Sequence, residues 1–263
     1  MSAPGRYPVS AWRAAAAGGL LGVVLLTVAA CGGGSNSTGS SASGSTPSSF
    51  DFGSNDARKA AAFGDSITLG VLEEKKVRSK LQTSNSYPSV LQSMLRGLDP
   101  AWRVVNRGVG GERTGAGVSR FPAVLTIDRP GFALIMEGTN DADAGGDAPA
   151  IVANLESMVL AAQGNRTIPI IGTIPPNFRN DPGARATVDQ ANAMIRAMAQ
   201  RRGVVLAEIF NGMNDRSLFG QAPDRDPLHP NDRGYQVMAG IWFDAMQRAV
   251  PQGTATALHR KRR

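Results

Sequence analysis

Short, almost continuously apolar segments alternate along the chain with longer segments whose apolar residues recur at helical spacing. Unbroken apolar runs are typical of parallel strands covered by helices on both faces. Five such runs predict strands at residues 60–63, 103–105, 132–136, 167–173 and 204–209. Five amphipathic patterns predict helices at residues 87–97, 115–126, 148–162, 187–202 and 232–250. This alternation predicts an α/β fold with one doubly wound sheet of five parallel strands and helices on both of its faces.

The order of these elements also predicts where a functional site lies. In open sheets of this flavodoxin-like type, ligands bind beyond the carboxyl ends of the strands. The residues directly after each predicted strand are therefore the first candidates for chemistry.

The amino terminus has the pattern of a secretion signal. Two arginines precede an uncharged, mostly apolar run at residues 14–30, which is shorter than the roughly 20 residues that span a bilayer. We therefore expect residues 1–30 to be a signal peptide. The run ends Val-Ala-Ala-Cys31, which resembles the lipobox of bacterial lipoproteins, and this resemblance implies that Cys31 is lipidated and becomes the new amino terminus. The alternative is ordinary cleavage near Ala30, which leaves a free thiol.

A flexible tether follows the signal. Fifteen of the 25 residues at 32–56 are Gly or Ser, and a coil of this length spans about 28 Å root-mean-square. We therefore expect a tether at residues 31–56, one folded domain at residues 57–250 and a basic tail at residues 251–263. With Cys31 lipidated, the domain would be exported and held at the outer face of the membrane.

Composition and charge narrow the function. Hydrophobic residues make up 42% of the chain and charged residues 19%, which suits a globular core and excludes a disordered chain or a coiled coil. One cysteine rules out a disulfide framework, and with only two histidines it also argues against a structural zinc site. The net charge is +7, part of it in the last five residues, and no basic patch with interleaved aromatics points to nucleic acid.

The first predicted strand ends at Gly64-Asp65-Ser66, which places a serine at a strand-to-helix turn. A serine there suits a nucleophile, because backbone N–H groups at the start of a helix stabilise a developing anion. The plainer alternative is that Asp65 or Ser66 only caps the helix. The motif is not the G-x-S-x-G elbow, since Thr68 stands in place of the second glycine.

Two further blocks follow the second and third predicted strands. Residues 106–112 (Asn-Arg-Gly-Val-Gly-Gly-Glu) form a glycine-rich turn, which is either a plain tight turn or a place where backbone approaches a ligand closely. It is not a dinucleotide fingerprint, because Arg113 stands where the third glycine belongs. Residues 138–141 (Gly-Thr-Asn-Asp) supply an uncharged amide donor in Asn140, although asparagine is also a common turn former.

The fourth block, Asp226-Pro227-Leu228-His229, stands directly before the last predicted helix. A carboxylate at this spacing can hold one imidazole nitrogen and leave the other free to accept a proton. A structural histidine is the alternative for His229 taken alone. A serine, a glycine turn, an amide and an Asp-His pair along one sheet together favour a catalytic site.

These four blocks, in this order, resemble the SGNH or GDSL-type hydrolase family, which is named for Ser, Gly, Asn and His in separate blocks. The likeness extends over residues 60–249 and is strongest to the compact bacterial arylesterase, thioesterase and lysophospholipase branch. Two positions depart from the family pattern, Arg113 and Pro227, and neither has a catalytic role. The resemblance implies the triad Ser66, His229 and Asp226, and an oxyanion hole formed by Ser66, Gly111 and Asn140.

The resemblance implies a serine esterase or lipase that hydrolyses carboxylic esters through an acyl-serine intermediate without a metal or organic cofactor. Its substrate would be a small-molecule, lipid or carbohydrate ester. One alternative keeps the site and changes the reaction to carbohydrate O-acetyl ester hydrolysis or acyl transfer. Another is a non-catalytic binding lipoprotein. The sequence sets neither the acyl chain, nor the alcohol, nor the oligomeric state.

Overall fold

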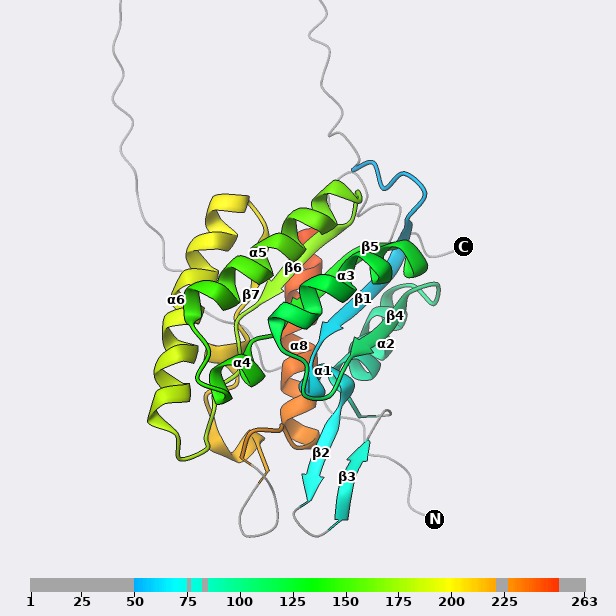
Figure 1. The fold of residues 1–263 in the computed structure, drawn as a ribbon. Helices are drawn as coiled ribbons and strands as arrows, with labels where there is room; N and C mark the ends of the chain where they lie inside the picture. Colours follow the sequence, from blue (N-terminus) through cyan, green and yellow to red (C-terminus); the bar gives the residue numbers. More distant parts are fainter. Residues whose placement is uncertain (1–49, 75–76, 82–84, 221–226, 251–263) are drawn as a thin grey trace, which may run out of the picture. The chain divides into compact units, whose positions relative to one another are not determined.

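The computed structural model describes residues 50–74, 77–81, 85–220 and 227–250. Its central sheet consists of β1 (Asp56–Gly64), β4 (Arg103–Gly108), β5 (Pro130–Met136), β6 (Ile168–Gly172) and β7 (Val205–Ala207). The strands are parallel and lie in the order β4-β1-β5-β6-β7 (Figure 1). The predicted doubly wound sheet of five parallel strands is confirmed.

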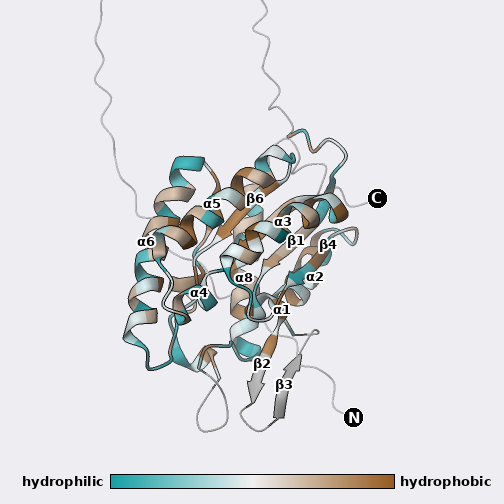
Figure 2. Cartoon of the chain, in the orientation of Figure 1, coloured by the Kyte–Doolittle hydropathy of each residue, from teal (hydrophilic) through white to brown (hydrophobic). Residues whose placement is uncertain are grey.

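Helices cover both faces of the sheet. The long helices are α2 (Tyr87–Leu98), α3 (Thr114–Asp128), α5 (Ala148–Gly164), α6 (Pro182–Arg202) and α8 (Asp232–Ala249). In Figure 1, α3, α5 and α6 lie in front of the sheet and α8 lies behind it. Successive residues of β1 enter opposite core layers: Ala60 and Ala62 pack with α2 and α8, whereas Ala61 and Phe63 pack with α3, α5 and α6. Figure 2 shows the hydrophobic colour along the strands and hydrophilic colour on the outer turns of the helices.

Several short elements lie at the carboxyl ends of the strands and were not predicted individually. The helices are α1 (Ser66–Leu69) after β1, α4 (Thr139–Asp143) after β5, α7 (Ile209–Gly212) after β7, and the 3-10 helix η1 (Arg216–Leu218). An antiparallel hairpin of β2 (Val71–Glu74) and β3 (Val77–Leu81) follows α1. These elements are too short to show a hydrophobic period, so the sequence pattern could not distinguish them from loops.

Two boundaries differ from those expected from the sequence. β4, the second strand of the central sheet in chain order, continues through Gly108, because its parallel pairing with β1 extends to Gly64 opposite Gly108. Residues 106–108 are therefore the end of a strand rather than the start of the turn. In addition, Phe52 is buried against Phe132, so packing on the domain begins within the segment that composition assigned to the tether.

Part of the expected organisation lies outside the described residues. The signal peptide at residues 1–30, Cys31, residues 32–49 of the tether and the tail at residues 251–263 all belong to that part. Among the helices of the described residues, none combines the length and the apolar character that crossing a membrane requires.

Candidate active site

Close backbone packing at the carboxyl edge of the sheet holds α1 in place. A Cβ atom at Gly108 would lie 2.2 Å from the Leu69 nitrogen, so only glycine lets α1 approach the end of β4 this closely. Asn106 strengthens the contact, because its Nδ2 donates to the Thr68 carbonyl (2.9 Å) while its Oδ1 accepts from Gly108 N (2.9 Å). The glycine-rich block thus positions α1 relative to the sheet.

Ser66 is the first residue of α1 and is half-buried. Asp65 caps this helix, as its Oδ1 accepts a hydrogen bond from Ile67 N at 2.9 Å. The Ser66 Oγ lies 2.9 Å from His229 Nε2, although 163 positions separate the two residues in the sequence. The structure therefore brings together the two side chains expected to carry the chemistry. The helix cap is Asp65, so Ser66 is not needed for capping.

His229 is held by backbone pairing immediately before α8. Its carbonyl accepts from Gly220 N (3.0 Å), and Asn231 N donates to the Leu218 carbonyl (2.9 Å). A Cβ atom at Gly234 would lie 2.1 Å from that Leu218 oxygen, so the close approach requires glycine. His229 is buried, with 4% of the residue exposed. Asp226, the expected third member of the triad, lies outside the described residues.

The two other expected oxyanion donors lie on neighbouring segments. Gly111 has φ +75°, in a turn closed by a bond from Glu112 N to the Val109 carbonyl (3.2 Å). Asn140 lies in α4, and its Nδ2 donates to the Glu112 carbonyl at 2.9 Å. A second, longer contact of 3.4 Å runs from Nδ2 to Asp65 Oδ2. Asn140 therefore joins the glycine turn to the residue that precedes the serine.

Comparisons with known proteins identify the family of the chain. The sequence model described as the GDSL-like Lipase/Acylhydrolase family matches residues 62–237, which is more than half of the chain. The chain belongs to this family. It is 29% identical over 169 residues to esterase TesA of Pseudomonas aeruginosa, a match that covers 64% of this chain and 77% of that protein. The protein is therefore a carboxylic ester hydrolase.

This GDSL-family hydrolase is also similar to a second esterase in sequence and to a solved structure in fold. An arylesterase of Vibrio mimicus is 28% identical over 122 residues, which are 46% of this chain and 57% of that protein. The crystal structure of a lipase/acylhydrolase from Enterococcus faecalis superimposes with a TM-score of 0.63 at 22% identity, covering 74% of this chain and 98% of that one. At this identity the structural match establishes the shared fold.

Two acids beside Ser66 and Asn140 also help to hold the site together: Asp65, which is buried, and Asp141, which is half-buried. Burial raises the pKa of Asp65 to about 7, an effect that the bond from Ile67 N opposes and the charges of Asp141 and Glu112 reinforce. Asp141 accepts from both Thr114 N (3.0 Å) and Thr114 Oγ1 (2.7 Å), and it thereby fastens the first residue of α3 to α4. The sequence suggested Asp65 as a helix cap, whereas no local signal distinguished Asp141 from an ordinary turn residue.

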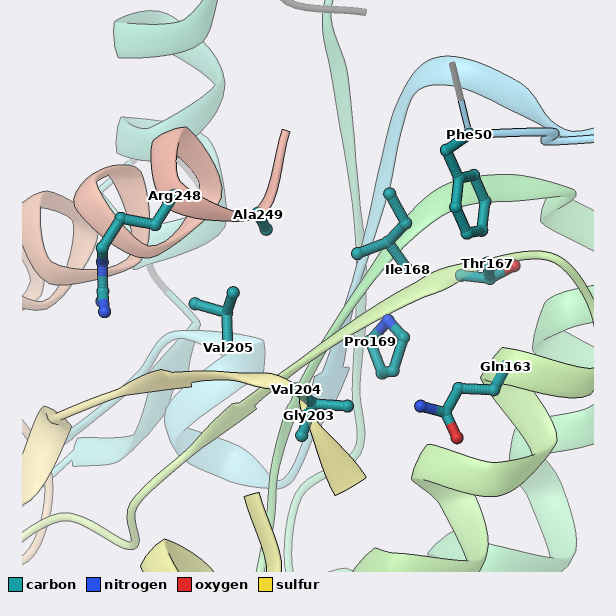
Figure 3. Close-up of a pocket in the computed structure, with 10 residues that line it drawn as sticks. All are labelled: Phe50, Gln163, Thr167, Ile168, Pro169, Gly203, Val204, Val205, Arg248 and Ala249. Carbon is teal, nitrogen blue, oxygen red and sulfur yellow. The ribbon is translucent and has the colours of Figure 1, made fainter. Parts of the chain in front are cut away.

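A pocket of about 300 Å³ lies elsewhere on this hydrolase. Figure 3 shows Ile168, Pro169 and Val205 lining it, together with Phe50 and residues of α5 and α8. These residues begin β6 and β7, so the pocket is at the amino edge of the sheet, opposite the serine. In the part of the chain that the structure describes, no group of three or more His, Cys, Asp or Glu side chains could hold a metal ion.

Proposed function

We propose that this hydrolase cleaves carboxylic esters through an acyl-enzyme intermediate on Ser66, with His229 as general base and general acid. The observation that carries the proposal is the 2.9 Å contact between Ser66 Oγ and His229 Nε2. Nε2 accepts the hydroxyl proton when the imidazole is neutral with its own proton on Nδ1.

The reaction proceeds in two stages. In the first, the Ser66 oxygen attacks the ester carbonyl while its proton passes to His229, and His229 then returns that proton to the leaving alcohol as the C–O bond breaks. In the second, water attacks the acyl-serine by the same route and releases the acid and the free serine. Asp226 orients the ring and stabilises the imidazolium that forms in both stages.

Three donors stabilise the carbonyl oxygen as it gains charge: the N–H groups of Ser66 and Gly111 and the amide of Asn140. One N–H of Asn140 is engaged by the Glu112 carbonyl at 2.9 Å. The contact from the same nitrogen to Asp65 Oδ2, at 3.4 Å, is long for a hydrogen bond, and in this proposal Nδ2 directs its second N–H to the substrate oxygen instead.

A fluorophosphonate probe tests the nucleophile, because it labels only an activated serine. We expect labelling of the peptide that carries Ser66, loss of labelling in Ser66→Ala, and normal labelling in Ser93→Ala, a serine exposed on α2. A folded Ser66→Ala protein that is still labelled at the wild-type rate would refute the assignment. A series of p-nitrophenyl esters of increasing chain length would then define the acyl group accepted.

The amino-terminal pattern supports a cellular location for the same enzyme. The apolar run that ends at Cys31, followed by a Gly/Ser-rich segment, suits an exported protein anchored to the outer face of the membrane by diacylated Cys31. Metabolic labelling with a fatty-acid analogue should mark the wild-type protein and not Cys31→Ser. Mature protein that begins near Cys31 with a free thiol would instead indicate ordinary secretion.

A further inference from the structure

Glu137 is a buried acid at the carboxyl end of β5 that the proposed reaction does not use. It is 1% exposed, and neither of its carboxyl oxygens accepts a hydrogen bond from any described donor group. The space for this carboxyl is provided by α3, where a Cβ atom at Gly117 would lie 2.1 Å from Glu137 Oε2. A buried polar group without a donor is costly, so this arrangement needs an explanation.

The group that Glu137 meets is the carboxyl of Glu112. Two ionised carboxyls only accept hydrogen bonds and repel one another, so they can bond only when one of them holds a proton. Arg120 identifies which one is ionised. Its guanidinium forks onto Glu112, with Nε to Oε1 at 2.8 Å and Nη2 to Oε2 at 2.5 Å, and lies over the Phe63 ring.

The proton therefore resides on Glu137. Burial raises the pKa of Glu137 to about 10, and the bond to Glu112 and the charge of that carboxylate add to the effect. Burial also raises the pKa of Glu112, but the hydrogen bonds from Arg120 and Glu137 outweigh it and leave the pKa below its ordinary value. The result is a neutral acid that donates to a carboxylate, which is in turn held by an arginine.

This chain of contacts joins the two segments that carry the proposed oxyanion donors. Glu112 directly follows Gly111, and its own carbonyl accepts the amide of Asn140 at 2.9 Å. Glu137 stands three residues before Asn140. The side chain and the main chain of Glu112 thus both bind the segment that follows β5.

We propose that Glu137, as a protonated acid hydrogen-bonded to the Arg120-held carboxylate of Glu112, is a positioning residue that keeps Gly111 and Asn140 in register as oxyanion donors. The inference rests on the proposed function, because it assigns Glu137 a role through those donors rather than a contact with substrate. Oxyanion stabilisation depends on donors that are in place before the charge develops, and small displacements are costly to the rate.

Two substitutions of Glu137 distinguish the effect of its hydrogen bond to Glu112 from the effect of its acidic proton. Glu137→Leu removes the donor at similar volume, and we expect kcat to fall about 10- to 100-fold with KM nearly unchanged. Glu137→Gln keeps an N–H donor toward Glu112, and we expect it to retain most of kcat. In an Asn140→Ala background the Glu137→Leu substitution should lose part of its effect, because Asn140, one of the two donors that Glu137 positions, is already absent.

The pH profile supplies a readout that a purely packing role would not move. The charged groups facing Glu137 are Glu112 from the glycine turn, Arg120 from α3 and Asp65 from the end of β1. When Glu137 loses its proton at alkaline pH, two carboxylates face one another, and we expect kcat to decline there in the wild type but not in Glu137→Gln. The stability contributed by the protonated group is complete below the ordinary pKa of Glu and is lost as pH rises toward about 10.

Controls make each outcome decisive. Glu156→Gln alters another arginine-bound glutamate, on α5, and should leave kcat and its pH profile unchanged. A folded Glu137→Leu protein with wild-type kcat, or a Glu137→Gln profile that keeps the alkaline decline, would overturn the inference. If Glu137→Leu does not fold, the Glu137→Gln profile decides alone. Wild-type turnover in Ser66→Ala would instead overturn the proposed function itself, so the two failures are distinguishable.

Discussion

The two edges of the sheet differ in the number of acidic side chains that are buried there. At the carboxyl edge, Asp65, Glu112 and Glu137 are buried and bonded to backbone groups, to an arginine or to one another. At the amino edge, Arg166 and Asp51 form an exposed ion pair at 3.2 Å, with side chains 62% and 74% exposed, and Asp128 is the buried acid, held by Arg107. The pocket at that edge is bordered mostly by apolar side chains and backbone.

This difference favours the carboxyl edge as the place of the active site. Exposed ion pairs contribute about 0–1 kcal/mol each and tolerate change. Buried polar groups are costly unless each finds a partner, so a cluster of them persists where its geometry serves a further purpose. The pocket lies at the amino edge, whereas the hydrogen-bonded side chains of the candidate active site lie at the opposite edge.

The largest effect is expected when His229, the proposed base at the carboxyl edge, is removed. His229→Ala should lower kcat by roughly 10⁴- to 10⁶-fold, since it removes the acceptor for the Ser66 proton. Steady-state hydrolysis of p-nitrophenyl acetate measures the loss. The only other histidine of the chain, His259, offers the matched control, and His259→Ala should keep wild-type turnover. Comparable rates in the two variants would contradict the assigned base.

An asparagine at each edge provides the next comparison. Asn140→Ala removes one oxyanion donor and should cost about 10²- to 10³-fold in kcat. Asn55, at the amino edge, likewise donates to a backbone carbonyl, that of Asn165 at 2.6 Å. Asn55→Ala should reduce the thermal midpoint but not kcat. Equal kinetic losses in both variants would show that the bond has only a structural role.

Glycines at the two edges should respond in opposite directions. Gly108→Ala would place its Cβ against the backbone of α1 and should destabilise the protein by about 1–3 kcal/mol, with a loss of activity. Gly97, near the end of α2, has no heavy atom within 4 Å of an added Cβ. Gly97→Ala should be neutral or stabilising by up to about 1 kcal/mol. Urea unfolding of both variants measures the difference.

The smallest effect is expected for the ion pair between Arg202 and Glu156, which lies on the surface at 2.6 Å. Glu156→Gln should change the free energy of unfolding by about 0–1 kcal/mol, because both groups stay hydrated and salt screens them. Chemical denaturation at low and high salt tests this. A loss of several kcal/mol would mean that this pair is more than a solvated surface contact.

The sequence predicted the long elements well and the short ones poorly. All five strands and all five long helices were recognised, because each repeats its pattern over enough residues to show a period. The four-residue helix α1 and the hairpin that follows it were not predicted individually. The place of α1 depends on Gly108, which lets α1 pack on β4, a contact between residues far apart in the chain.

In the candidate site, too, the sequence predicted some residues and missed others. Ser66 and His229 were predicted from their motifs, and the structure places them in contact. Gly111 and Asn140 were predicted as donors, but their connection through Glu112 was not. Glu137 had no local signal at all, since an acid after a strand is ordinary until the burial of its side chain is known.

By itself, the sequence determined the class of the fold, the order of its long elements and the four blocks that mark an ester hydrolase, because these depend on local periodicity and on residue types at fixed spacing. The tertiary structure alone decided that Glu137 faces Glu112, that Arg120 holds the latter, and that Asn140 joins the glycine turn to the end of β1. Those contacts join segments that follow different strands, so they exist only once β4, β1 and β5 are aligned side by side in the folded sheet.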